Sequence, residues 1–113
     1  DSGVPGTVFS SNQYYLDHGF DNTAEAKKRE NVTIIGNVFI AEDAVVENAV
    51  IGPSVSIASG STISNSIIAN AVIGKNTTVQ NKILQDTLIG DNVKLESVAE
   101  KLFLGDNSTS FPV

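Results

Sequence analysis

The strongest constraint in this sequence is a repeat of aliphatic residues at every fifth or sixth position. Between residues 34 and 95, twelve successive positions at that spacing carry isoleucine, valine or leucine. They are Ile34, Ile40, Val46, Ile51, Ile57, Ile63, Ile68, Ile73, Val79, Leu84, Ile89 and Leu95. The residue two places before each of them is small or β-branched in eleven of the twelve cases, and only Lys82 departs from this rule. A repeat with a fixed short period is typical of a solenoid, in which each unit packs on its neighbours along the chain.

The spacing predicts three short strands in every coil of about 16 or 17 residues. In each strand the first and third residues are expected to point inward and the middle residue outward. Ile40, Ile57, Ile73 and Ile89 are then expected to lie above one another on the axis. Successive coils stack about 4.8 Å apart, so each backbone group can pair with the coil above or below. We interpret the chain as an all-β parallel β-helix of about four to five coils over residues 32–111.

The predicted corners of the coil carry their own repeats. Asparagine recurs at Asn48, Asn65 and Asn81, and it takes the left-handed conformation more readily than most non-glycine residues. A second corner repeats Gly-x-Asn at residues 74–76, 90–92 and 105–107. Turn chemistry explains both columns without a ligand, and the sequence has no glycine-rich loop of the kind that binds phosphate.

Composition excludes several classes of function. The net charge of −6 argues against a nucleic acid or an anionic membrane as partner. The absence of cysteine excludes disulfides and thiolate chemistry. No apolar run approaches membrane-spanning length, and the N-terminus lacks the layout of a signal peptide. We expect a cytoplasmic protein, and the start at Asp1 without a methionine predicts a fragment or a processed product.

The segment before the repeats predicts one or two short helices. One is expected from Thr7 to Leu16, after a turn at residues 3–6. Asn22 followed by Glu25 is typical of a capping box, which would start a second helix through residue 30.

The repeats resemble those of the left-handed β-helix family. This family occurs in hexapeptide acyltransferases and in the C-terminal domains of sugar-phosphate nucleotidylyltransferases, and the resemblance rests on units of the form I-G-x-x-[ST/V]-x. It implies left-handed winding, whereas the general rule for parallel crossovers would give a right-handed coil. The motif is specific for the fold and much less specific for the function.

The first sixteen residues, DSGVPGTVFSSNQYYL, resemble the end of the catalytic domain of glucose-1-phosphate thymidylyltransferases. The matching positions of the family segment are Asp1, Gly3, Pro5, Thr7, Asn12, Tyr14 and Leu16. The resemblance implies that residues 1–31 are the end of a nucleotidyltransferase domain with a helical linker. Residues 32–113 would then be the left-handed β-helix domain.

The same resemblance matches Asp1 to an aspartate that helps to bind the catalytic magnesium. Magnesium keeps several waters and usually needs additional carboxylate or phosphate ligands. The nucleotide loop, the sugar-phosphate pocket and the partner aspartate of the family are absent from this sequence. We therefore predict no catalytic, cofactor-binding or metal site in this chain, and we expect magnesium only for the full-length parent enzyme.

The remaining candidates for chemistry are weak. His18 is the single histidine and precedes the repeats, whereas hexapeptide acyltransferases use a histidine base on the β-helix. A γ-type carbonic anhydrase needs three histidine zinc ligands and is excluded. The run Lys27-Lys28-Arg29 is interpreted as a solvated helix face. Tyr14 and Tyr15 are expected to pack the helix against the β-helix or against the missing catalytic domain.

The middle residues of the predicted strands distinguish the three sides. Val45, Thr62, Thr78 and Lys94 form an ordinary polar surface. Two other sides carry aliphatic columns, one with Thr33, Val50, Ile67 and Ile83, the other with Phe39, Ser56, Val72, Leu88 and Phe103. Contiguous exposed apolar residues mark contact sites. We predict an interface at Val50, Ile67, Ile83, Phe39, Val72 and Leu88, covered by a symmetric oligomer, by the N-terminal helices or by the catalytic domain. The alternative is that outward valine and isoleucine reflect strand propensity alone.

These observations favour an oligomerisation or regulatory module of a sugar-1-phosphate nucleotidylyltransferase. The parent enzyme would convert a nucleoside triphosphate and a sugar 1-phosphate into a nucleotide sugar and pyrophosphate. This chain alone is expected to be inactive and to form a homo-oligomer. The alternative is a hexapeptide acyltransferase domain that uses acetyl-CoA on an amino sugar.

Overall fold

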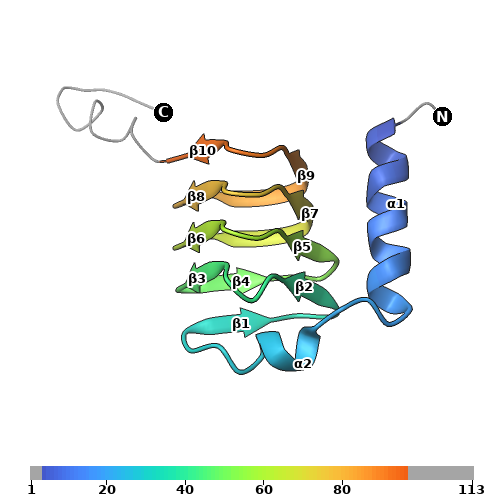
Figure 1. The fold of residues 1–113 in the computed structure, drawn as a ribbon, viewed down its shortest axis with the longest axis horizontal. Coiled ribbons are helices and arrows are strands. Elements are labelled where there is room, and N and C mark those ends of the chain that lie inside the picture. The colour runs from blue at the N-terminus through green and yellow to red at the C-terminus, as the bar shows by residue number, and fades with distance from the viewer. Residues whose placement is uncertain (1–3, 97–113) are drawn as a thin grey trace, which may run out of the picture.

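The computed structural model of this chain describes residues 4–96, which form two helices followed by ten short strands (Figure 1). The helices are α1 (Val4–Asp17) and α2 (Thr23–Ala26). The strands are β1 (Val32–Ile34), β2 (Val38–Ile40), β3 (Val45–Glu47), β4 (Ala49–Ile51), β5 (Val55–Ile57), β6 (Thr62–Ser64), β7 (Ile67–Ile73), β8 (Thr78–Gln80), β9 (Ile83–Ile89) and β10 (Lys94–Leu95).

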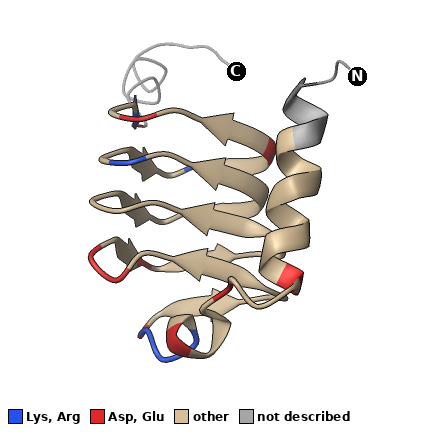
Figure 2. Cartoon of the chain, turned by 45° about the vertical axis from the view of Figure 1, so that its right-hand side comes forward, with Lys and Arg blue, Asp and Glu red and all other residues tan. Residues whose placement is uncertain are grey.

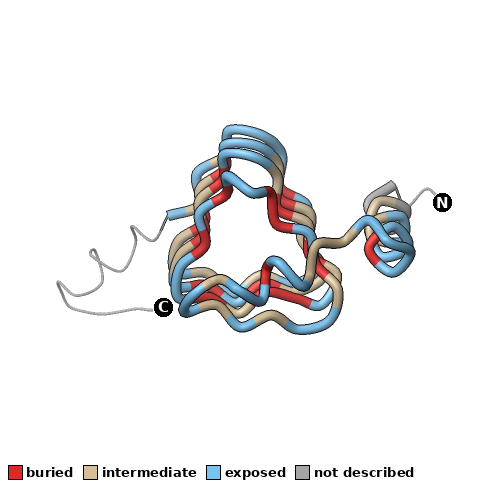
Figure 3. The backbone as a smooth tube through the Cα atoms, turned by 60° about the horizontal axis from the view of Figure 1, so that its bottom comes forward, coloured by how far each residue is buried: buried red, intermediate tan, exposed pale blue. Residues whose placement is uncertain are grey.

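The strands wind into four stacked coils with three flat sides, which confirms the predicted β-helix (Figure 3). The first side contains β1, β4 and the beginnings of β7 and β9. The second side contains β2, β5 and the ends of β7 and β9, and the third contains β3, β6, β8 and β10. All paired strands are parallel, and each pairs with residues one coil away, as Val50 does with Ile67 and Ile67 with Ile83. Left-handed winding stays a prediction from the resemblance.

The inward positions form a buried, mainly apolar core along the axis. The large aliphatic residues of the two central coils are at most 1% exposed, among them Ile51, Ile57, Ile63, Ile68 and Ile73. Ile34, Leu84 and Leu95 belong to the end coils and are half-buried, because only one neighbouring coil covers them in the described part of the chain. The core therefore follows the repeat that the sequence predicts.

Small polar residues at the inward corner positions satisfy one another from coil to coil. The Ser61 hydroxyl donates to the Gly74 carbonyl at 2.7 Å and accepts from the Thr77 backbone N–H at 3.0 Å. The Thr77 hydroxyl continues the chain by donating to the Gly90 carbonyl at 2.8 Å. Among the side chains that the structure describes, residues 8–96, no buried nitrogen or oxygen lacks a hydrogen-bond partner. A buried hydroxyl costs little here because its hydrogen bonds are complete.

The predicted asparagine corners are confirmed. Asn31, Asn48, Asn65 and Asn81 all have φ between 51° and 60°, as do Asn76 and Asn92 at another corner. Gly74, which the sequence places at a corner, does not have a positive φ. A Cβ on Gly74 would instead lie 2.5 Å from the backbone of Gly90 on the next coil. This glycine is required by the close approach of two coils rather than by its own conformation.

The two N-terminal helices exist, with different starts and lengths from those expected. α1 begins at Val4, so the turn predicted for residues 3–6 is wrong for residues 4–6. Pro5 lies in the first turn of the helix, where its missing N–H would have no partner in any case. α2 begins after Asn22 as predicted but ends at Ala26 instead of extending through residue 30.

The predicted capping box is wrong, because Asn22 makes no side-chain cap to α2. Its amide instead pairs with the backbone of Ile40, donating to the carbonyl at 2.7 Å and accepting from the N–H at 2.9 Å. The Thr23 hydroxyl accepts from the Val38 N–H at 3.0 Å. Asn22 and Thr23 thus occupy the open edge of β2, which would otherwise present unpaired backbone groups.

Arg29 closes the same end of the β-helix. Its guanidinium donates to the carbonyls of Ala44 at 2.9 Å and Ala41 at 3.1 Å, and Ala26 of α2 is buried against the end of the core. The prediction of a solvated helix face is therefore wrong for Arg29, although Lys27 and Lys28 are exposed.

Some expectations lie outside the described residues. They concern Asp1, Phe103, the Gly-Asp-Asn turn at residues 105–107 and any coil beyond residue 96. The division into residues 1–31 and 32–113 also stays a prediction, although the first strand does begin at Val32.

Candidate interaction surfaces

The three sides of the coil are covered to different extents. The third side carries Val45, Thr62, Thr78 and Lys94 and is open to solvent or half-buried. The second side has α1 alongside it, and the first side has no covering element among the described residues (Figure 1). The predicted interface residues are therefore divided between two different environments.

α1 packs beside the second side and is fastened there by Asn12. The Asn12 amide donates to the Ser54 carbonyl at 3.2 Å, and its oxygen accepts a hydrogen bond from the Ser56 hydroxyl. Among the residues of this helix whose burial is described, Leu16 is the buried apolar one, at 3% exposure. Val72 is half-buried on this side, whereas Phe39 and Leu88 keep 37% and 50% of their surface exposed. The N-terminal helix, which is one of the predicted covers of the interface residues, thus covers part of the second side.

An apolar notch remains between α1 and the second side. It has a volume of about 390 Å³ and is lined by Asn12, Tyr15, Leu16, Phe20, Phe39 and Ser56. Tyr14 and Tyr15 are 57% and 54% exposed, so they contribute less to packing on the β-helix than expected. Tyr15 contacts Phe20 edge-to-face, with ring centroids 5.5 Å apart.

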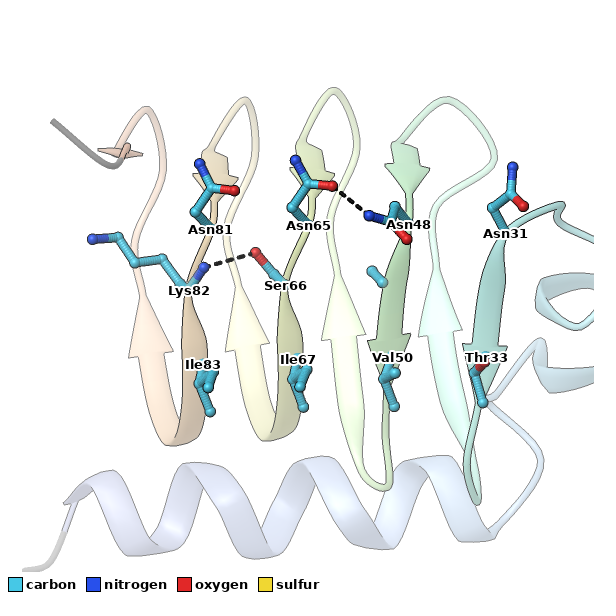
Figure 4. A pocket seen from close by; sticks show the side chains of 11 residues that line it. Asn31, Thr33, Asn48, Val50, Asn65, Ser66, Ile67, Asn81, Lys82 and Ile83 are labelled. Atoms are coloured by element: carbon cyan, nitrogen blue, oxygen red, sulfur yellow. Dashed lines mark hydrogen bonds between the residues drawn. The ribbon is translucent and has the colours of Figure 1, made fainter. Parts of the chain in front are cut away.

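The first side forms an open groove with two parallel columns (Figure 4). The asparagines of the corner, Asn31, Asn48, Asn65 and Asn81, line one edge, and Thr33, Val50, Ile67 and Ile83 form the floor. The groove has a volume of about 710 Å³. Exposure of the aliphatic floor increases toward the later coils, from a half-buried Val50 to 48% for Ile67 and 80% for Ile83. Ile83 is the most exposed aliphatic residue of the described β-helix.

Most charged residues of the described β-helix lie between strands, whereas Glu47, Asp86 and Lys94 lie within β3, β9 and β10 (Figure 2). Beside the groove, Lys82 and Asp86 lie at opposite corners of the same coil, on either side of Ile83. Asp86 accepts a hydrogen bond from Asn70 at 2.6 Å, while no carboxylate within residues 4–96 lies in ion-pair distance of Lys82. The Lys82 backbone N–H donates to the Ser66 hydroxyl at 3.1 Å (Figure 4). This hydrogen bond keeps Lys82 in the strand register, although the other eleven strands have a small or β-branched residue at this position.

The structure gives little support to other chemistry. His18 is exposed just after α1, as expected, with its ring stacked on Tyr14 at a centroid distance of 3.9 Å. Within the described part of the chain, no three His, Cys, Asp or Glu side chains are grouped to hold a metal ion. Neither helix in residues 4–96 is long and apolar enough to cross a membrane.

Comparison with protein families decides the affiliation of the chain. Residues 11–108 match the family described as the GMPPB C-terminal domain, a sugar nucleotidyltransferase C-terminal domain. The chain belongs to this family. Membership confirms the coarser part of the resemblance, because it indicates the C-terminal part of a sugar-1-phosphate nucleotidylyltransferase. Searches of curated proteins and of solved structures gave no match.

Sequence reasoning missed the residues that attach the N-terminal segment to the β-helix. Asn12, Asn22, Thr23 and Arg29 make hydrogen bonds across at least twelve positions of the chain. Asn12 carried a signal, since it stands at the asparagine of the family segment. For Asn22 and Arg29 the local pattern suggested a helix cap and a solvated face instead.

Proposed function

We propose that this member of the GMPPB C-terminal domain family is a non-catalytic module that assembles its parent enzyme through the first side of the β-helix. The observation that supports this most directly is the outward column of half-buried Val50 and exposed Ile67 and Ile83 above a core that is already complete. Because the inward positions fill the axis without them, these side chains are not needed to close the fold. A partner that covers them gains roughly 1.5–3 kcal/mol for each aliphatic side chain that becomes fully buried.

The size of the groove sets the expected strength of association. Four coils about 4.8 Å apart and a strand with its corners give a face of roughly 300 Å² per copy. Stable interfaces bury about 800 Å² per partner. The first side alone therefore supports a weak, concentration-dependent contact, which further contacts of the parent enzyme would strengthen.

The parent reaction is nucleotidyl transfer from a nucleoside triphosphate to a sugar 1-phosphate, with release of pyrophosphate. On the resemblance of the first sixteen residues we propose thymidine triphosphate as the nucleotide donor and glucose 1-phosphate as the acceptor. The same resemblance supports magnesium as the metal of the parent enzyme, held in its catalytic domain. We propose that the enzyme is cytoplasmic and that the module has a structural role, with regulation of the catalytic domain through the same contacts.

The test compares the assembly of two matched substitutions by sedimentation velocity. Ile67→Lys places a charge in the centre of the groove, and Val45→Lys places the same charge on the third side, where Val45 is 46% exposed. We expect Ile67→Lys to abolish the concentration-dependent rise in sedimentation coefficient, and Val45→Lys to leave it unchanged. Equal behaviour of the two variants and the unmodified chain would show that the outward aliphatic column reflects strand propensity alone.

A separate assay tests the non-catalytic assignment. The chain is incubated with acetyl-CoA and amino-sugar phosphates, and the release of free thiol is followed. We expect no turnover above the uncatalysed rate, because the single histidine lies outside the β-helix. Turnover by this chain alone would overturn the proposal in favour of an acyltransferase, and its loss in His18→Ala would identify His18 as the base.

A further inference from the structure

The floor of the groove is graded along the stack of coils. From the first described coil to the fourth, its outward residues are Thr33, Val50, Ile67 and Ile83, so the polar residue lies at one end of the described coils and the most exposed isoleucine at the other. A second copy can face this floor in two symmetric ways. A two-fold axis along the stack places each coil opposite the same coil of the partner, and an axis along the strands, through the middle of the described coils, places the fourth coil opposite the first.

The gradient separates these two arrangements. With the axis along the stack, Ile83 faces Ile83 and Ile67 faces Ile67, so that the largest aliphatic surfaces cover one another. With the axis along the strands, each Ile83 faces Thr33, and apolar surface is paired with a hydroxyl. Since apolar burial contributes in proportion to the apolar area removed from water, the coil-to-coil arrangement is favoured.

The charges beside Ile83 fit the same arrangement. Lys82 and Asp86 flank Ile83 at opposite corners of one coil, and a two-fold axis along the stack exchanges the corners. Lys82 of each copy therefore lies opposite Asp86 of the other, which makes two equivalent pairs of opposite charge. Asp86 uses one carboxylate oxygen for Asn70 and keeps acceptor capacity for a lysine. The reversed arrangement also offers Lys82 a carboxylate, Glu30, but it brings Asp86 to the corner where Asn37 binds Asp17.

We propose that two copies of this chain associate through the first side with their β-helices parallel and in register, related by a two-fold axis along the stack. This inference rests on the proposed assembly function and specifies its geometry. The interface is isologous, so each outward residue on the centre line meets its own counterpart. The asparagine corner of one copy faces the Ser54, Asn70 and Asp86 corner of the other.

Crosslinking tests the orientation, because the chain has no cysteine of its own. Two packed sheets lie about 10 Å apart, too far for a direct disulfide, so a short bismaleimide is the suitable reagent. Ile83→Cys alone is expected to give a covalent dimer, since each new thiol faces its own copy. The matched control Val45→Cys, on the third side, is expected to give monomer under the same conditions.

The outcomes separate the two proposals. If Ile83→Cys stays monomeric but a mixture of Ile83→Cys and Thr33→Cys gives a mixed dimer, the copies are reversed, and the parallel geometry is refuted while assembly stands. If sedimentation shows the unmodified chain to be monomeric at every concentration, both proposals fail. A parallel dimer is supported only when Ile83→Cys crosslinks with itself.

Removal of one charge provides a second readout. Asp86→Asn keeps a residue suited to the positive φ of 54° at this corner and removes the partner proposed for Lys82. Exposed ion pairs contribute little individually, so we expect the dissociation constant to rise about two- to tenfold, with a weaker dependence on salt. A dissociation constant and a salt dependence unchanged by Asp86→Asn would contradict the proposed Lys82–Asp86 contact.

Discussion

At the scale of single residues, the corner before β1, β4, β7 and β9 places one residue of every described coil in the left-handed conformation. Asparagine supplies it at Asn31, Asn48, Asn65 and Asn81, and neighbouring side chains of this column can also bond, as the Asn48 amide does to the Asn65 oxygen at 2.6 Å. The sequence predicts this column well, because the requirement is local and asparagine is one of the few residues that meet it.

Substitution of Asn65 tests the backbone requirement. Asn65→Ala and Asn65→Gly both lose the hydrogen bond with Asn48, so the difference between them reports the left-handed conformation. We expect the alanine variant to be less stable than the glycine variant by about 1 kcal/mol. Urea denaturation measures both free energies of unfolding, and an alanine variant at least as stable as glycine would contradict this reading of the corner.

Gly74 is required by the close approach of the next coil. A Cβ on Gly74 would lie 2.5 Å from Asp91 and from the Gly90 backbone. Gly74→Ala is expected to destabilise the chain by about 1–3 kcal/mol through overpacking. Thermal unfolding of the variant and the unmodified chain checks this loss, and equal stability of the two would contradict it.

Asp43 gives a pH-dependent test of another corner. The Ser59 hydroxyl donates to its carboxylate at 2.7 Å and the Gly60 N–H at 3.2 Å, and these hydrogen bonds, the Ser59 bond first, lower the pKa of Asp43 below its ordinary value. Because this pKa is lower in the folded state, the stabilisation is present above the unfolded-state pKa and is lost as the pH falls through the folded-state pKa.

Ser59→Ala is therefore expected to raise the pKa of Asp43 toward its ordinary value and to reduce the acid dependence of stability. Carboxyl NMR titration measures the pKa directly. Asp21, whose pKa is lowered by Thr23, serves as the internal control that the substitution leaves unchanged. An Asp43 pKa that is the same with and without the Ser59 hydroxyl would refute this assignment.

At the scale of elements, the strands and the N-terminal segment differ in how far the sequence predicts them. Each strand repeats the same inward pattern, so twelve weak signals support one another. The N-terminal segment appears once. α1 has Leu16 as its buried apolar residue and is fastened by polar contacts of Asn12, which no hydrophobic period reveals. Arg29 and Asn22 act on backbone groups that are distant in the sequence, so their roles could not be read from their neighbours.

Arg29 provides the test at this scale. It bridges the carbonyls of Ala41 and Ala44 at the end of the first coil, and hydrogen bonds that involve a charged group contribute about 1.5–3 kcal/mol. Arg29→Ala is expected to lose stability of that size, and Arg29→Lys part of it, since an ammonium lacks the planar fork of the guanidinium.

The control is Lys28→Ala, which removes an exposed ion pair with Glu25 and should be nearly neutral. Chemical denaturation of the three variants gives the comparison. If Arg29→Ala were as mild as Lys28→Ala, Arg29 would not be an effective cap of the β-helix.

At the scale of the whole molecule, the three sides of the coil have equivalent inward residues. Their outward residues have different surroundings. The sequence predicts which residues point outward, and hence the two aliphatic columns. It could not predict that α1 lies beside only one of them, because that choice depends on contacts between Asn12 and the corner at Ser54. The remaining open column, with Ile67 and Ile83, is the basis of the proposed assembly.

The most direct test of the proposed assembly is the mass of the unmodified chain by sedimentation equilibrium over a concentration series that reaches the millimolar range. We predict that the mass rises from the 11.9 kDa monomer toward twice that value, and that Ile67→Lys stays at 11.9 kDa throughout. A mass of 11.9 kDa for the unmodified chain at every concentration would contradict the proposed assembly through the first side.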